Sequence, residues 1–419
     1  MSIKINVHND PEVAQIVRTL ALEGYEGPGK TELESKEKYR WLRECGTRLW
    51  LDTGDFGAAQ KVYSPEVEAL TTNNTLVNQV VQTGALDDVL SHSAKKIREA
   101  RPDMSEQDMI IELAFLANAK LALSLVQRLG AHVSVELHPA TAYDVEQTLT
   151  FARRYYAIEP EHFYVKVPLT PDGYVATRIL SSEGIPINYT LGFSARQNYL
   201  AALFSKPKFV NVFLGRLNSL VEENGLGQPE NVGEKTTLAS DEAVKMIRST
   251  NAGIQTSQIA ASMRSGAQVP ILAGVDVFTM PPKVADEYLA MDVSKEDVHP
   301  RLADELNVEL FDTGLGRIIP LETLWEIDED FVEFAEDAAQ QGDQMRDGQA
   351  LMQMADEHNI NLFRRWTDEE RHAIREHGKI PDLTQWPGAP IDDLMSISAL
   401  ETFAKDQAAL DDRIRGLLP

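Results

Sequence analysis

The sequence has almost no cysteine and no excess of basic residues. Its single cysteine, Cys45, rules out an intramolecular disulfide and cannot by itself form a multi-cysteine metal site. The formal net charge is −25, from 65 acidic and 40 basic side chains. This charge argues against nucleic-acid binding, because a protein needs a basic face to displace counterions from phosphates. A small anionic substrate is still compatible with it, provided that a few arginines converge locally.

Long apolar runs and nucleotide-binding turns are also missing. No run approaches 18 apolar residues, and Met1–Asn6 lacks the apolar core of a signal peptide. We therefore expect a cytoplasmic protein that does not bind a membrane. No Gly-x-Gly-x-x-Gly turn follows the first expected strand, and no His, Cys or Asp spacing typical of a metal site is present, so we expect neither a cofactor nor a metal.

What the sequence does contain is a regular alternation of strands and helices. The expected strands are 47–52, 68–72, 132–137, 163–167, 187–191, 209–214, 254–260 and 277–280. Alternation with helices implies parallel pairing, and about eight strands over this length favour an α/β fold of the closed (β/α)₈ TIM-barrel type. An open doubly wound sheet is the alternative, although it lacks the glycine-rich turn expected of it.

This pattern divides the chain into four parts. A helical extension at 1–46 precedes the barrel domain at 47–285, an acidic helical and loop elaboration occupies 286–390, and a C-terminal helix at 391–419 packs on the barrel. We interpret the acidic charge of the elaboration as a solvated face and not as a site.

The middle of the fourth strand carries one lysine, Lys166, among apolar and aromatic residues. Burying an ammonium group is costly unless the group has a partner or a function. Burial favours the neutral amine, which attacks carbonyl groups to form a Schiff base. The structural alternative is a lysine that is ion-paired or extends its amine to solvent.

Polar residues recur where the expected strands end, which is where barrel enzymes have their active sites. They are Asp52, Asn73, Ser134, Glu136, Lys166, Asn188, Thr190, Asn211, Arg216, Ser262 and Arg264. Seven strands that each contribute such a group are hard to explain by core packing, because each buried polar group needs a partner. The set suits carbon–carbon bond cleavage through an imine, with carboxylates for proton transfer and two arginines for a phosphate.

At this point the sequence resembles the transaldolase family. The resemblance covers about residues 47–285 and 391–418. It rests on Leu51-Asp52-Thr53-Gly54-Asp55, Thr71-Thr72-Asn73, Val133-Ser134-Val135-Glu136, Val165-Lys166-Val167, Gly184-Ile185-Pro186-Ile187-Asn188-Tyr189-Thr190-Leu191, Phe213-Leu214-Gly215-Arg216 and Ala261-Ser262-Met263-Arg264, in the family's order. It implies a class I, Schiff-base enzyme that acts on sugar phosphates without a cofactor, and it leaves a homodimer open.

The resemblance also implies roles for single residues. Lys166 matches the Schiff-base lysine, Asp52 the acid/base, and Glu136 with Thr190 the pair that orders the catalytic water. The remaining matches concern substrate or supporting contacts: Asn73, Ser134 and Asn188 near the sugar hydroxyls, and Arg216, Ser262 and Arg264 near the phosphate. Asn211 and Phe213 are further candidate substrate-binding residues, at positions where the family has other side chains.

Each role has a structural alternative. Asp52 could cap the turn at Thr53-Gly54, Thr190 and Ser134 could be ordinary strand residues, and Arg216 could pair with an acidic neighbour.

Three departures from the family pattern concern the substrate more than the imine. Asn73-Asn74-Thr75 replaces Asn-Pro-Ser, Asn211 replaces a phosphate-contacting serine, and His138 follows the third strand where the family continues differently. We expect His138 to be a hydrogen-bonded structural histidine.

Three functions fit the sequence. The first is a transaldolase that moves a dihydroxyacetone unit between sugar phosphates, and the second is a related aldolase that releases free dihydroxyacetone. Similar aldolases have glutamine at the position of Glu136 and tyrosine at that of Phe213, so both residues favour the transferase. The third is a non-catalytic sugar-binding barrel, which has no need of a buried lysine.

Overall fold

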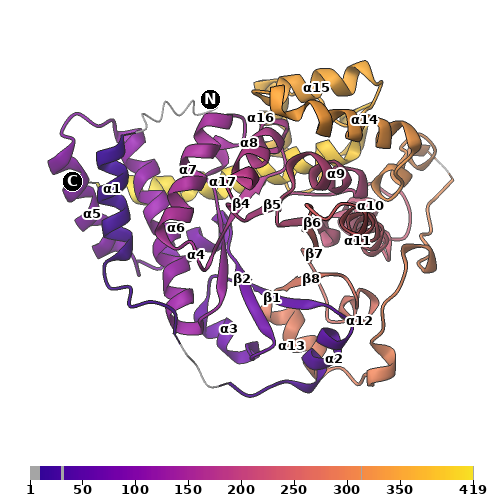
Figure 1. Ribbon diagram of the computed structural model, residues 1–419, viewed down its shortest axis with the longest axis horizontal. Coiled ribbons are helices and arrows are strands. Elements are labelled where there is room, and N and C mark those ends of the chain that lie inside the picture. The colour runs from indigo at the N-terminus through magenta and orange to yellow at the C-terminus, as the bar shows by residue number, and fades with distance from the viewer. Residues whose placement is uncertain (1–9, 30–32, 313, 419) are drawn as a thin grey trace.

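The computed structural model describes residues 10–29, 33–312 and 314–418, so the sequence interpretation of Met1–Asn6 lies outside the described residues. Eight parallel strands follow one another in chain order around a closed barrel (Figure 1). The strands are β1 Arg48–Asp52, β2 Val67–Thr71, β3 His132–Glu136, β4 Phe163–Pro168, β5 Ile187–Thr190, β6 Phe209–Phe213, β7 Ser257–Ala261 and β8 Val277–Met280. Because β8 pairs with β1, the (β/α)₈ prediction is confirmed and the open-sheet alternative is wrong.

Helices surround this barrel. They are α3 Phe56–Val62, α4 Asn74–Gln82, α5 Asp87–Ala100, α6 Glu106–Leu129, α7 Val145–Ile158, α8 Pro171–Ser182, α9 Ala195–Leu200, α10 Leu214–Glu223, α11 Val232–Thr250, α12 Gln268–Ile271 and α13 Pro282–Ala290, preceded by α1 Pro11–Leu22 and α2 Glu37–Glu44. Helix α6 is long and apolar enough by composition to cross a membrane, but 89% of its most apolar window is buried inside the protein. It is therefore a core helix, packed on β3 and α17 (Ile391–Arg415).

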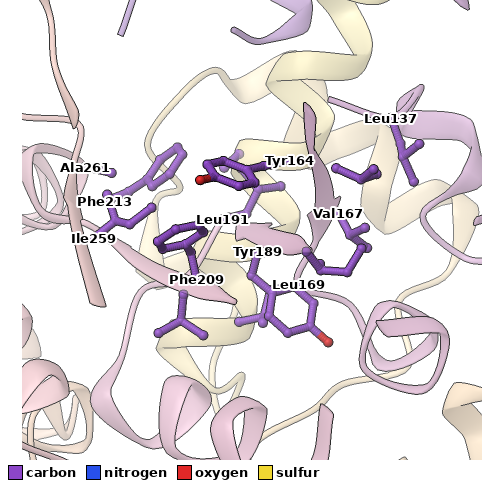
Figure 2. Packing of buried hydrophobic residues seen from close by; sticks show 14 of the residues in the cluster. Leu137, Tyr164, Val167, Leu169, Tyr189, Leu191, Phe209, Phe213, Ile259 and Ala261 are labelled. Carbon is purple, nitrogen blue, oxygen red and sulfur yellow. The ribbon is translucent and has the colours of Figure 1, made fainter. Parts of the chain in front are cut away.

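Side chains that alternate along the strands fill the barrel interior in layers. An aromatic layer lies near the amino ends of the strands, where the Trp50 ring stacks on that of Tyr164 at 5.4 Å and meets the edge of Phe209 at 4.6 Å. Figure 2 shows the Tyr164 and Phe209 rings close together, with centroids 5.1 Å apart. The next inward residue along β4 after Tyr164 is Lys166, so the aromatic layer forms an apolar floor beneath the lysine.

The region between α13 and α17 packs on one side of the barrel. Its helices are α14 Glu329–Gln341, α15 Gly348–Glu357 and α16 Asp368–His377. Figure 1 shows α14 and α15 in orange beside α9 and α8. Helix α14 contacts α9, α15 contacts α8, and α16 contacts α17. Although the region is acidic, Phe331, Phe334 and Leu351 are fully buried and belong to the same hydrophobic core as the barrel.

Candidate active site

Lys166 lies inside the barrel with only 4% of its surface exposed. Its Nζ donates to the backbone carbonyl of Thr72 at 3.2 Å and lies 3.7 Å from Oε2 of Glu136. Glu136, Lys166 and Asn188 are register partners on adjacent strands, which explains why their side chains share one level of the barrel. The amine points toward other polar groups and not toward bulk solvent.

Asp52 ends β1 and lines the same cavity as Lys166. Its Oδ1 accepts a hydrogen bond from Oγ1 of Thr71 at 2.7 Å, and that hydroxyl lies 2.7 Å from Oγ1 of Thr279 on β8. Burial raises the pKa of the Asp52 carboxyl, while the charge of Lys166 and the Thr71 hydroxyl lower it. The turn that follows is capped by Asp55, whose Oδ1 accepts from the backbone N–H of Gly57 at 2.7 Å, so capping does not explain Asp52.

Glu136 and Thr190 are both almost completely buried. Burial raises the pKa of Glu136, and the nearby Lys166 charge lowers it. Among the described residues, Oε2 of Glu136 and Oγ1 of Thr190 have no hydrogen-bond partner. Because a buried polar atom without a partner is costly, both atoms are suited to bind a small polar molecule.

A cavity of about 260 Å³ opens at the carboxyl ends of the strands. Nine of the twelve predicted site residues line it: Asp52, Asn73, Lys166, Asn188, Asn211, Phe213, Arg216, Ser262 and Arg264. Lys166 and Asp52 line it together with the cations Arg216 and Arg264. The volume and lining suit a small, polar, anionic ligand.

The arginines of this cavity are held by unusual local geometry. Arg216 lies in the first turn of α10, and only 7% of it is exposed. Burial and the charge of Arg264 lower its pKa to about 10. A Cβ atom at Gly215 would lie only 2.6 Å from Cγ of Arg264. A glycine is therefore needed at this position of α10 for the Arg264 side chain to pack against it. Ser262 adopts the left-handed backbone region at φ 61°, a conformation often found at functional sites.

The interpretation of Arg216 as an ordinary ion-pair partner does not hold. Among the described residues, no carboxylate forms an ion pair with it. Its Nη1 donates to the backbone carbonyl of Lys379 at 3.3 Å, and its guanidinium lies over the Phe403 ring at 5.7 Å. The charge of Asp406 favours the protonated form of the Arg216 guanidinium, although the Asp406 carboxylate forms no ion pair with it.

Three polar residues near the strand ends are held by the protein itself. Ser134 accepts from Nδ2 of Asn188 at 2.9 Å and does not line the cavity. Asn211 lines the cavity, but its amide is shared between the backbone N–H of Gly192 and the carbonyl of Tyr189, which suits a supporting role. The Nδ1 atom of His138 accepts from the N–H of Ala140 at 3.1 Å, so the prediction of a structural histidine is confirmed.

Sequence reasoning missed several residues of the cavity. The Thr71–Thr279 hydroxyl pair that contacts Asp52 joins strands 208 residues apart in the sequence. Phe403 of α17 and Lys379 beyond α16 also line the cavity, although both lie outside the barrel strands. Thr71 could have been found, because it ends β2 at the level where β1 ends in Asp52. No sequence spacing indicates the other residues.

Comparison with known proteins agrees with this geometry. A sequence profile described as transaldolase/fructose-6-phosphate aldolase matches residues 49–344. The chain belongs to this family. A transaldolase of Allorhizobium ampelinum is 27% identical over 272 residues, which cover 62% of this chain and 80% of that protein. A transaldolase of Agrobacterium fabrum is 28% identical over 257 residues, or 58% and 74% of the two chains.

A shorter relative gives a higher identity. A probable transaldolase of Nitrosopumilus maritimus is 37% identical over 146 residues, which cover 34% of this chain and 60% of that protein. Together these matches show that the chain is an enzyme of the transaldolase type built on a TIM barrel. The family profile extends past the barrel to residue 344 and so includes α14, but it ends before α15, α16 and the loop that carries Lys379.

Proposed function

We propose that this enzyme is a transaldolase that transfers a dihydroxyacetone unit from a ketose phosphate to an aldose phosphate through an imine on Lys166. The donor is fructose 6-phosphate or sedoheptulose 7-phosphate, and the acceptor is glyceraldehyde 3-phosphate or erythrose 4-phosphate. The observation that carries the proposal is a buried lysine in one cavity with Asp52 and two arginines that have no ion-pair partner among the described residues. The proposal assigns the enzyme to the pentose phosphate pathway in the cytoplasm.

The first steps join the donor to the enzyme. Nζ of Lys166 attacks the ketose carbonyl carbon and forms a carbinolamine, which loses water to give the protonated imine. Glu136 lies 3.7 Å from the amine, close enough to hold the water that takes part in these steps. Thr190 offers a second buried polar atom without a partner among the described residues. Such a pair can deliver a proton to the carbinolamine hydroxyl, which then leaves as water.

The next steps break and remake a carbon–carbon bond. Asp52 removes the proton from the hydroxyl next to the breaking bond, and the electron pair of that bond moves into the imine, which becomes an enamine. The aldose phosphate leaves, and the acceptor aldehyde takes its place. The enamine then attacks the acceptor carbonyl, and Asp52 returns the proton to the new hydroxyl. Addition of water to the imine releases the product and restores Lys166.

Two residues favour transfer over release of free dihydroxyacetone. Release requires that the enamine carbon be protonated before an acceptor arrives. Phe213 lines the cavity with an apolar ring and has no proton to donate, whereas a tyrosine there would. Glu136 is a carboxylate and not an amide, and it lies beside the amine. The enamine therefore persists until an aldehyde binds.

Chemical trapping tests this proposal directly. Sodium borohydride added in the presence of fructose 6-phosphate reduces the imine, so we expect a covalent adduct on Lys166 by peptide mass spectrometry and irreversible loss of activity. No adduct under these conditions would refute the covalent mechanism. The fate of the three-carbon unit separates the two enzymes, because a transaldolase delivers it to erythrose 4-phosphate whereas an aldolase releases free dihydroxyacetone without an acceptor.

Replacement of Arg264 by alanine tests the phosphate site. We expect Arg264→Ala to raise KM for fructose 6-phosphate by roughly 10–100-fold with a smaller change in kcat, because a charge-assisted contact to a distant phosphate contributes mainly to binding. Steady-state kinetics with fructose 6-phosphate and with unphosphorylated fructose measure the difference. Arg317→Ala, which removes an exposed arginine paired with Asp312, is the matched control. Equal losses on both donors would contradict a phosphate role for Arg264.

A further inference from the structure

A loop outside the barrel reaches the active-site cavity. Lys379, which follows α16, lines the cavity together with Arg216, Ser262 and Arg264. Its backbone carbonyl accepts from Nη1 of Arg216 at 3.3 Å and from Oγ of Ser398 at 3.2 Å. The loop is therefore hydrogen-bonded to a residue of the site and to α17 at the same time.

Contacts on both sides of Lys379 fix the position of this loop. Gly378 ends α16 at φ 127°, a backbone conformation that L residues rarely adopt, and Ile380 is buried. The carbonyl of Pro381 accepts from Nδ2 of Asn224 at 3.0 Å, and Oδ1 of Asn224 accepts from the N–H of Leu383 at 2.9 Å. Asn224 ends α10, the helix that begins at the cavity. The same helix thus positions both Arg216 and the loop.

The charges at this end of the cavity are unbalanced. Arg216, Arg264 and Lys379 form no ion pair with a carboxylate of the described residues, although the chain has 65 acidic side chains against 40 basic ones. By contrast, Arg375 of α16 is paired with Glu401, at a distance of 2.7 Å. None of these three cations of one cavity is ion-paired within the described residues, so their charges repel one another, and a bound anion would relieve that repulsion.

We propose that Lys379 is a third phosphate-binding residue, through which the segment between α13 and α17 takes part in substrate selection. The inference rests on the proposed function, because it assigns Lys379 to the phosphate of the same sugar substrates. The two arginines supply planar, forked donors, and the lysine adds a compact charge with three donors from the loop beyond α16. Together they favour a phosphate dianion over a neutral sugar hydroxyl.

The test compares phosphorylated and unphosphorylated ligands on the full-length enzyme. We expect Lys379→Met to raise KM for fructose 6-phosphate and the Kd of inorganic phosphate, measured by titration calorimetry, by roughly 3–10-fold, as for loss of one partly exposed charge-assisted contact. Lys379→Glu should raise both by tenfold or more, about the effect of replacing attraction by repulsion. Lys379→Arg keeps the charge and should restore both to within about twofold of the wild type.

Lys405→Met is the matched control, because Lys405 is an exposed lysine of α17 that does not line the cavity. An unchanged Kd for inorganic phosphate in Lys379→Met, or an equal loss in Lys405→Met, would overturn the inference. An equal fall in kcat/KM on fructose and on fructose 6-phosphate would overturn it as well. Failure of the proposed function has a different signature, because the wild type would then form no borohydride adduct whatever the phosphate affinity of the Lys379 variants.

Discussion

Lys166→Met is expected to abolish both the borohydride adduct and sugar transfer. Methionine matches the length of the lysine and suits the buried position, where only 4% of the residue is exposed, but it has no amine to form the imine. Because the covalent route is lost entirely, we expect kcat/KM for fructose 6-phosphate to fall by at least ~10⁴-fold. A coupled assay for glyceraldehyde 3-phosphate measures the fall, and intact-protein mass spectrometry measures the adduct.

Lys208→Met serves as the control for this variant. Lys208 is an exposed lysine at the amino end of β6, where its Nζ lies 5.5 Å from the Tyr164 ring centroid on the far side of the aromatic floor. It should keep normal activity and form the adduct. Circular dichroism checks that both variants are folded. If Lys166→Met kept more than a tenth of the wild-type activity, catalysis through an imine on this residue would be ruled out.

Asp52→Asn is expected to separate imine formation from bond cleavage. The amide keeps the shape of the carboxylate and can still accept the hydrogen bond from Thr71, but it cannot take the proton of the substrate hydroxyl. We expect kcat to fall by about 10²–10⁴-fold, the usual contribution of a general base. The borohydride adduct should still form, because Glu136 serves the dehydration step. Loss of the adduct in Asp52→Asn would contradict this division of roles.

The same variant should change both the pH profile and the stability. Asp52 must be ionised to accept a proton, and burial raises its pKa above the ordinary 3.8. As the pH is lowered, wild-type kcat should therefore begin to fall at a pH above 3.8. The kcat of Asp52→Asn should not show this fall, because the variant has no carboxylate to protonate. A folded-state pKa above the unfolded-state pKa contributes stability below the unfolded pKa, and this contribution is lost as pH rises through the folded pKa.

It follows that ionised Asp52 destabilises the fold near neutral pH. Asp52→Asn should then raise the midpoint of urea denaturation at pH 7.5, while the two proteins should converge near pH 4. The exposed helix cap Asp55 offers the matched variant Asp55→Asn, which should change neither activity nor this pH dependence. A lower midpoint for Asp52→Asn at pH 7.5 would contradict the expected cost of burying this carboxylate.

The barrel and its central residues follow from local patterns in the sequence. Alternating side chains put Tyr164 and Lys166 on the same face of β4, and the order of strands and helices implied closure. The sequence also predicts a helix at 171–182, and these are the bounds of α8. Thr170 caps this helix, because its side chain accepts from the N–H of Gly173.

The rest of the cavity depends on contacts that span long distances in the sequence. Arg216 and Lys379 are 163 residues apart, and no spacing rule connects them. The composition of the segment at 286–390 indicates a solvated acidic face, and it gives no sign that one lysine of this segment lines the cavity. The burial of Phe331 and Phe334 is likewise not evident from the sequence, because both residues have acidic neighbours. Composition describes the average of a region, whereas a site depends on single side chains.

Closure of the barrel has a consequence for assembly. Each of the eight strands has a hydrogen-bonded neighbour on both sides, because β8 returns to β1. An open sheet offers its outermost backbone groups to another chain, which permits strand addition and the growth of fibrils. The eight barrel strands of the described residues offer no such edge, so we expect two copies to associate through the surrounding helices and loops. A change in those outer surfaces can therefore alter how copies associate without altering the interior that carries the chemistry.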